Sequence, residues 1–219
     1  AREMVQIGTL AGRDMSAVIS DMDQPLGYAV GNALEVKEAI ATLNGNGPED
    51  LRELVLVLTS LMVVKAGKAK DIREARILLE ETLDSGKALQ VMKEWIVAQG
   101  GTAEEVEHPD LLPQALCQEA VCAEKSGFVT KIHTEEIGRI CMLLGGGRAK
   151  KGDPIDLSVG LVLRKKVGDP VHSGESLAIL HANDREKLAE AKERLLKAYE
   201  IKKEPVAVRP LIWKILDGT

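Results

Sequence analysis

A glycine-rich basic stretch is the first place where the residue types could do chemistry. Gly145-Gly146-Gly147-Arg148 is followed by Lys150 and Lys151, and backbone amides beside cationic side chains can hold an anion. The spacing matches no phosphate-loop pattern of glycines followed by Lys and Ser or Thr. The alternative is a helix that ends at a glycine and continues into a solvated basic loop. The sequence favours this second interpretation.

The other residues capable of metal or nucleophilic chemistry are not grouped along the chain. The histidines show no metal-ligand spacing and are expected at the surface or in caps: His108, His133, His172 and His181. The cysteines lack the two-residue spacing of zinc sites and are expected to be small, reduced core residues: Cys117, Cys122 and Cys141. Three glutamates do not form a recognisable acid pair: Glu35, Glu38 and Glu53. No catalytic or substrate-binding residue is therefore assigned.

The composition excludes several classes of protein. Of the 219 residues, two are Trp, two Tyr and one Phe, and the formal net charge is −5. Base-stacking platforms and basic nucleic-acid surfaces are not expected with these values. The longest apolar run, residues 54–64, is shorter than the roughly 20 residues of a membrane span, and the first residues lack a signal-peptide layout. We expect a cytoplasmic protein that binds neither nucleic acid nor membrane.

The elements that must position any site are helical through the first half. Helices are predicted over 4–10, 32–43, 51–64, 71–83 and 89–96, and a short strand over 17–19. Asp50 and Asp71 are predicted to cap the helices that follow them. The helix over 51–64 is apolar on all faces, which is typical of a buried helix. The polar segment 102–113 contains prolines and is interpreted as a connection.

The second half alternates strands and helices. Strands are predicted over 127–132, 155–163 and 176–180, and helices over 134–144 and from a cap at Asn183 to Tyr199. The segment 166–178 resembles the hairpins of biotinyl and lipoyl carrier domains, but it lacks a carrier lysine at the turn tip, so a structural hairpin is expected. The fold class is α/β with a smaller α+β C-terminal module. The predicted domains are 1–113 and 114–219.

Four segments carry a resemblance that covers the whole chain in order. Residues 17–36 read AVISDMDQPLGYAVGNALEV, residues 46–51 read NGPEDL, residues 145–151 read GGGRAKK, and residues 155–160 read IDLSVG. Together they closely resemble pyrimidine-nucleoside phosphorylases and thymidine phosphorylases. Enzymes of this family are about twice this length, so the resemblance implies their C-terminal half: most of the larger α/β domain, then the C-terminal module.

The resemblance implies a function for the longer protein. It would cleave uridine, thymidine or deoxyuridine reversibly with phosphate as co-substrate, in pyrimidine salvage, and it would be a homodimer. The family's phosphate-binding and base-binding segments are not in this sequence, so the 219-residue chain alone is predicted to be inactive. Two alternatives are a related phosphorylase or phosphoribosyltransferase with another substrate, and a non-catalytic interaction module.

The resemblance also implies a potassium site. By residue matching, this sequence supplies the carbonyls of Leu26 and Ala29 and the carboxylate of Glu38, and oxygens of the family's phosphate-binding loop complete the site. A loop that turns at Pro25 and Gly27 can point carbonyls inward, and Glu38 lies about two turns into the next helix. Oxygen donors of this kind suit a hard monovalent cation. The alternative is a solvated helix glutamate beside an ordinary turn.

Overall fold

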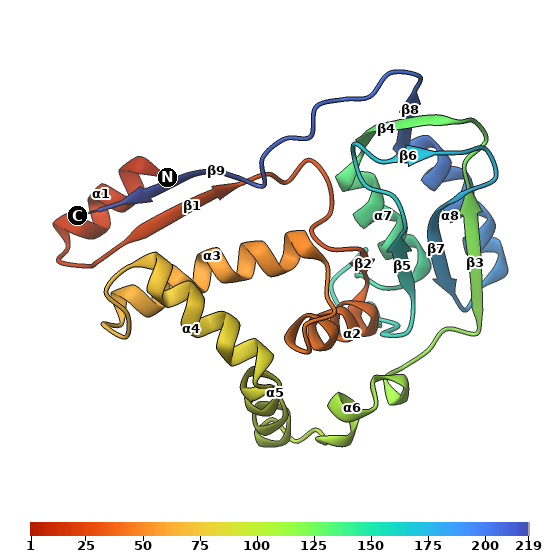
Figure 1. Cartoon of the computed structure of the whole chain (residues 1–219). Helices are drawn as coiled ribbons and strands as arrows, with labels where there is room; N and C mark the ends of the chain where they lie inside the picture. Colours follow the sequence, from red (N-terminus) through yellow and green to blue (C-terminus); the bar gives the residue numbers. More distant parts are fainter. Residues whose placement is uncertain (219) are drawn as a thin grey trace. The chain divides into compact units, whose positions relative to one another are not determined.

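The computed structural model describes residues 1–218, and the chain groups into two compact units that are each built from distant segments (Figure 1). The first unit comprises Ala1–Asp21, Thr42–Val91 and Arg209–Thr219, and the second comprises Met22–Ala41 and Met92–Val208. The mixed α/β character expected from the sequence is confirmed. The predicted domain boundary between residues 113 and 114 lies inside the second unit, and that division stays a prediction.

The first unit joins the two ends of the described chain in one antiparallel strand pair. Strand β1 pairs with β9 from Ser16 opposite Asp217 to Ser20 opposite Ile212, with a bulge between Ile19 and Ser20. Helix α1 contacts both strands, and α3 packs against α4. The elements of this unit are α1 (Arg2–Leu10), β1 (Ser16–Ser20), α3 (Glu49–Lys65), α4 (Ile72–Asp84) and β9 (Ile212–Asp217), and α5 (Lys87–Ala98) begins in it.

Local hydrogen bonds explain where α4 begins and correct the predicted start of α3. Asp71 accepts the backbone N–H of Glu74 at 2.8 Å, as predicted for the N-cap of α4. The predicted cap at Asp50 is wrong, because α3 begins at Glu49, two residues before the predicted start, and its N-cap is Pro48. The carboxylate of Asp50 accepts the N–H of the next residue, Leu51.

Arg76 joins α4 to α3. Its guanidinium donates to both carboxylate oxygens of Glu53, at 3.0 and 2.7 Å, and also to Glu80 at 3.0 Å. The expectation that α3 is buried on every face is wrong, since only Leu56, Ser60 and Leu61 are buried and Met62 is 68% exposed. The periodicity of an all-apolar helix does not indicate which of its faces meets a partner.

The second unit contains a four-stranded sheet in the order β2-β5-β7-β3 and a three-stranded sheet in the order β6-β4-β8 within the described residues. All neighbouring strands in both sheets are antiparallel. The strands are β2 (Ala29–Val30), β3 (Cys117–Cys122), β4 (Gly127–Ile132), β5 (Gly160–Leu163), β6 (Pro170–Val171), β7 (Ser176–Ala182) and β8 (Tyr199–Lys202). The helical segments are α2 (Asn32–Leu43), α6 (Glu104–Glu107), the 3-10 turn Pro109–Leu111, α7 (Thr134–Leu144) and α8 (Arg185–Ala198).

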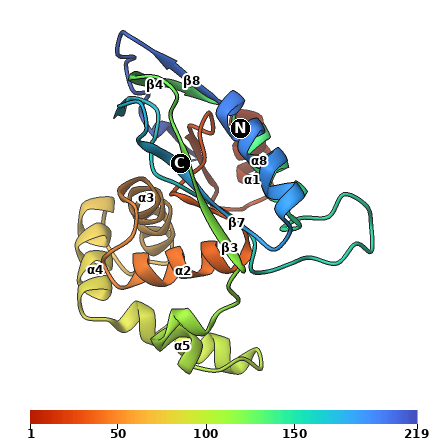
Figure 2. The same ribbon diagram turned by 90° about the vertical axis from the view of Figure 1, so that its right-hand side faces the viewer.

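Helices α7 and α8 cover this part of the structure and enclose its core. Helix α8 lies along β7 and β3 (Figure 2). Helix α7 contacts α8, β5 and β2. The core is made of apolar side chains that are almost fully buried, among them Val129, Ile137, Ile140, Leu161, Leu180 and Leu195. Apolar burial of this kind is the main stabilising term for such a unit.

Two predictions in the second half need correction. The strand predicted over 155–163 begins only at Gly160, because Asp156 instead accepts the N–H and hydroxyl of Ser158 in a tight turn. The cap of α8 is Asp184 rather than Asn183. The side chain of Asn183 is used elsewhere: it accepts the N–H of Leu116 at 2.7 Å and donates to Asp156.

The connection predicted over 102–113 contains the short helix α6 and a 3-10 turn. Among residues 1–218, no helix combines the length and apolar character needed to cross a membrane.

Candidate functional site

The carboxylate of Glu38 folds back onto the turn that precedes its own helix. Its Oε1 accepts the backbone N–H of Tyr28 at 2.8 Å and that of Ala29 at 3.0 Å. Gly27 has a φ of 66°, and a Cβ built on it would overlap Glu38 Oε2. Only glycine combines this left-handed backbone with the space that the carboxylate occupies. Glu38 therefore does not point into open solvent.

The register of β2 indicates the direction of the Ala29 carbonyl. Ala29 lies opposite Val162 of β5, and the N–H of Leu163 donates to the carbonyl of Tyr28 at 2.8 Å. Because hydrogen-bonded and non-hydrogen-bonded pairs alternate in antiparallel strands, the N–H and carbonyl of Ala29 both point away from β5. The N–H of Ala29 meets Glu38 on that side, so its carbonyl faces the same side of the strand.

The three residues matched to the potassium site thus belong to one local structure. Leu26 precedes the left-handed Gly27, and Ala29 and Glu38 are joined by the hydrogen bond described above. Within the part of the chain that the structure describes, no group of three or more His, Cys, Asp or Glu side chains could hold a metal. A cation at this turn would be held mainly by carbonyl oxygens, which suits a weakly demanding ion rather than zinc or a transition metal.

A lysine from the second half of the chain also contacts this turn. Lys166 is only 9% exposed, and its ammonium donates to the carbonyl of Pro25 and lies 5.4 Å from the centre of the Tyr28 ring. The next residue, Val167, donates its N–H to Gln24 Oε1 at 2.9 Å. Neither residue is predicted from the sequence, because a lysine 141 positions away carries no local signal of such a contact.

Three of the four segments that carry the family resemblance meet at the start of α2. Asn32 donates its side-chain amide to the carbonyl of Gly146 at 3.0 Å, and the N–H of Ala33 donates to the carbonyl of Leu157 at 3.0 Å. Glu35 accepts the N–H of Gly31 at 2.8 Å, which satisfies a free donor of the helix start. Three segments that are distant in the sequence therefore form one contact region around the helix that carries Glu38.

Two glycines allow β2 and β5 to approach closely. Gly31 and Gly160 have φ values of 131° and 150°. A Cβ on Gly31 would lie 2.5 Å from the carbonyl oxygen of Val159, and a Cβ on Gly160 would overlap that of Val30. Any side chain at either position would push β2 away from β5.

The glycine-rich basic stretch is a helix end, which confirms the interpretation favoured from the sequence. Gly145 is the C-cap of α7 with a φ of 111°, in the left-handed region. Asp153 closes the loop that follows, because its carbonyl accepts Arg148 Nε at 3.1 Å and its carboxylate accepts the N–H of Lys150 at 2.8 Å. The loop's own acidic residue thus takes up two of the donors that an anion could use.

Among residues 1–218, the remaining reactive side chains do not assemble into a catalytic group. Burial raises the pKa of the Cys141 thiol to about 11, so this cysteine is protonated at neutral pH. Burial lowers the pKa of His181, as do the nearby charges of Lys37 and Arg164, so its imidazole is neutral. These properties are those of packed residues rather than of a nucleophile and its base.

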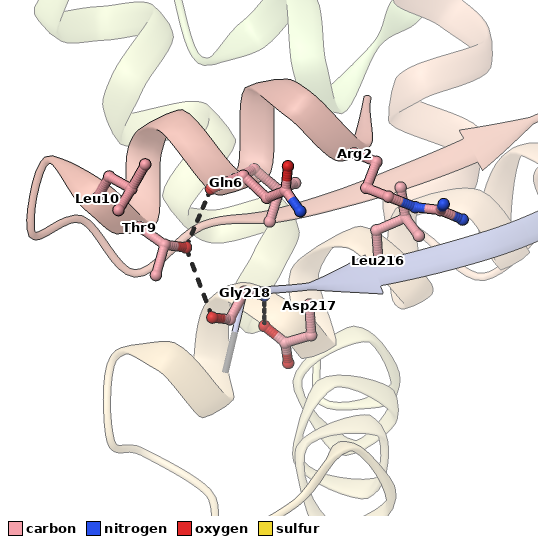
Figure 3. A pocket seen from close by; sticks show the side chains of 8 residues that line it. Arg2, Gln6, Thr9, Leu10, Leu216, Asp217 and Gly218 are labelled. Carbon is pink, nitrogen blue, oxygen red and sulfur yellow. Dashed lines mark hydrogen bonds between the residues drawn. The ribbon is translucent and has the colours of Figure 1, made fainter.

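A separate hollow lies between α1 and β9 in the first unit (Figure 3). It encloses about 620 Å³ and is lined by Arg2, Val5, Gln6, Thr9, Leu10, Leu216, Asp217 and Gly218. The hydroxyl of Thr9 donates to the carbonyl of Val5 at 3.0 Å. Asp217 accepts the N–H of Gly218 at 2.9 Å and pairs with Lys65 at 3.1 Å. Thr9 and Asp217 are engaged in these contacts, and the hollow holds none of the predicted site residues.

The chain is similar to known proteins along nearly all of its length. The family described as "Pyrimidine nucleoside phosphorylase C-terminal domain" matches residues 128–202, and the family described as "Glycosyl transferase family, a/b domain" matches residues 1–89. A pyrimidine-nucleoside phosphorylase from Geobacillus stearothermophilus is 51% identical over 213 residues, which cover 97% of this chain and 49% of the relative.

Two further relatives carry the same name. The proteins from Bacillus subtilis (strain 168) and Staphylococcus aureus (strain bovine RF122 / ET3-1) are 57% and 55% identical over 183 residues. In both cases the match covers 84% of this chain and 42% of the relative. The chain therefore spans about half the length of the curated relatives it matches.

Proposed function

The chain belongs to the pyrimidine-nucleoside phosphorylase family, and from this premise we propose that it supplies about half of an enzyme that cleaves pyrimidine nucleosides with phosphate. The observation that carries the proposal is 51% identity over 213 residues to a protein of that name. The match to a glycosyl transferase α/β domain over residues 1–89 agrees with transfer of a sugar group. The substrates would be uridine, thymidine or deoxyuridine.

The proposed reaction exchanges one bond at the sugar. A phosphate oxygen forms a bond to C1′ while the bond from C1′ to the base nitrogen breaks. The products are the (deoxy)ribose 1-phosphate and the free pyrimidine, which keeps the bonding electrons and takes up a proton. This chain contributes no catalytic residue to that step in our assignment. Its part is to provide the α/β body and the turn at residues 24–29.

We further propose that this turn holds a potassium ion through the carbonyls of Leu26 and Ala29 and the carboxylate of Glu38. Support comes from the hydrogen bond between Ala29 and Glu38, from the register of β2, and from a donor set made of oxygens. A bound cation would fix the turn and offset negative charge near phosphate. One carboxylate and neutral carbonyls balance a single positive charge better than a double one.

The remaining expectations follow from the resemblance and are proposed with it. The longer protein would be a cytoplasmic homodimer that binds neither nucleic acid nor membrane. The formal net charge of −5 supports the part concerning nucleic acid.

A chimera tests the proposed reaction. This chain replaces the matching region of the Geobacillus stearothermophilus relative, and uracil release from uridine is followed with and without phosphate. We expect phosphate-dependent release by the chimera and none by the 219-residue chain alone. A chimera that folds, as judged by circular dichroism and size, but releases no uracil would refute the proposal.

The potassium site is tested in the same chimera by a single isosteric change. Glu38→Gln keeps an oxygen that can accept both N–H groups, so the fold should be retained while the charge is lost. We expect the potassium concentration for half-maximal thermal stabilisation to rise at least about tenfold, which is about 1.4 kcal/mol. The matched control is Glu35→Gln, three residues earlier on the same helix, whose carboxylate accepts the N–H of Gly31 instead. Equal potassium responses in wild type and Glu38→Gln would show that the site is wrongly assigned.

A further inference from the structure

We propose that Lys166 is a positioning residue that fixes the turn at residues 24–29 so that the carbonyls of Leu26 and Ala29 face Glu38. The inference rests on the proposed potassium site, because it assigns a role toward that site to a residue more than a hundred positions away. Lys166 lies within the segment that matches the phosphorylase C-terminal domain, whereas the turn lies within the match to the α/β domain. The C-terminal domain would thus help to shape a site carried by the α/β segment.

The burial of Lys166 requires that its charge be compensated. Lysine is almost never fully buried unless its ammonium is paired, because removing the charge from water is costly. Here the ammonium donates to the Pro25 carbonyl and lies over the face of the Tyr28 ring. Both groups belong to the turn, so the turn receives the stabilisation that this buried charge provides.

The backbone that presents Lys166 is itself held in place. The N–H of Lys166 donates to Asp169 Oδ2 at 2.7 Å, and the N–H of Gly168 donates to the carbonyl of Val129 at 2.8 Å. Val129 is on β4 and is fully buried. The segment 166–169 is therefore a fixed support, and the loop that contacts it is the part that gains order.

Tyr28 is held from three directions. Its N–H donates to Glu38, its carbonyl accepts from Leu163, and its ring contacts Lys166. Gln24, four residues earlier, accepts the N–H of Val167. Binding sites must be held within about 0.5 Å of their working geometry by supporting groups. Lys166 and Val167 provide this support through their contacts with Pro25, Tyr28 and Gln24.

Hydrogen exchange in the 219-residue chain tests the role of Lys166 without an activity assay. Lys166→Met keeps most of the apolar stem and removes the ammonium. The amides of Tyr28 and Ala29, which donate to Glu38, should exchange at least about tenfold faster in this variant. The matched control is Lys165→Met, because the Lys165 ammonium pairs with Glu175 at 2.5 Å and with the Pro170 carbonyl instead of the turn. If Lys166→Met does not fold, Gln24→Ala removes the hydrogen bond between Gln24 and Val167. This variant should accelerate hydrogen exchange of the same two amides, those of Tyr28 and Ala29.

Potassium separates this inference from the proposed site. Exchange is then measured in the chimera, in KCl and in LiCl of equal ionic strength, and potassium should slow the two amides with the wild-type Lys166 at lower concentration than with Lys166→Met. The inference would be overturned if the Tyr28 and Ala29 amides exchanged at the same rate in Lys166→Met as in wild type, or if Lys165→Met accelerated them equally. It would also be overturned if Lys166→Met left unchanged the potassium concentration that slows these amides by half. A wild type indifferent to potassium would refute the proposed site, while the exchange rates of the variants would still decide whether Lys166 positions the turn.

Discussion

Replacing Gly160 with alanine should destabilise the second unit more than an ordinary glycine substitution. Gly160 has a φ of 150°, and its added Cβ would overlap the carbonyl oxygen of Val30 and lie 3.0 Å from the Cα of Gly31. Both neighbours are backbone atoms, so they cannot yield by changing rotamer. Relief requires β2 to move away from β5, which breaks the pairing of Val30 with Leu161.

The expected magnitude has two parts. A side chain at an unfavourable positive φ costs about 1–3 kcal/mol, and overpacking against atoms that cannot relax costs about 1–3 kcal/mol more. Gly160→Ala should therefore lose about 2–6 kcal/mol. Gly152 is the matched control, because its φ is 96° but nothing lies within 4 Å of its added Cβ. Gly152→Ala should show only the first part.

Urea unfolding followed by circular dichroism measures the difference between the two variants. With a slope of about 2 kcal/mol per molar urea, an additional 2 kcal/mol lowers the midpoint by about 1 M. The midpoint of Gly160→Ala should therefore fall about 1 M below that of Gly152→Ala. Equal midpoints would refute the argument that the close approach of β2 and β5 requires a glycine at this position.

Three other predictions concern the ion pair on α3, the buried thiol and the chain connection. The Arg76 guanidinium lowers the pKa of Glu53 below its ordinary value of 4.5. The ion pair therefore stabilises the fold above pH 4.5, and this stabilisation is lost as the pH falls through the lower pKa of the folded state. Glu53→Gln should cost about 0.5 kcal/mol of unfolding free energy at pH 7 and should flatten its dependence on acid pH in urea titrations. At pH 8 a thiol reagent should modify exposed Cys122 rapidly and buried Cys141 only in denaturant, whereas rapid labelling of both would contradict the packing around α7. Proteolytic cleavage within residues 104–113 should leave two fragments that co-elute on gel filtration, because the strand pairs β2–β5 and β1–β9 join residues on both sides of the cut. Separate elution would support an independent module at 114–219.

The sequence by itself determined the features that depend on neighbouring residues. Asp71 begins α4 and Gly145 ends α7 as predicted, because each acts through its own backbone or through a hydrogen bond three residues away. The contact between Glu38 and the turn is also short in sequence, since it joins residues nine and ten positions apart. The pattern of the turn and the family resemblance were enough to bring these residues together.

Only the tertiary structure decided which distant segments meet. The pairing of β1 with β9 and the contact of Lys166 with Pro25 join parts of the chain that lie far apart in sequence. A lysine that becomes buried has the same local pattern as a lysine at the surface, so nothing near residue 166 reveals its partner. The boundary predicted at 113 and 114 followed a local change in composition, whereas strand pairing links both sides of it. The hydrogen bonds and burial of such residues depend on which distant segments of the chain pack beside them, and local sequence patterns do not encode that packing.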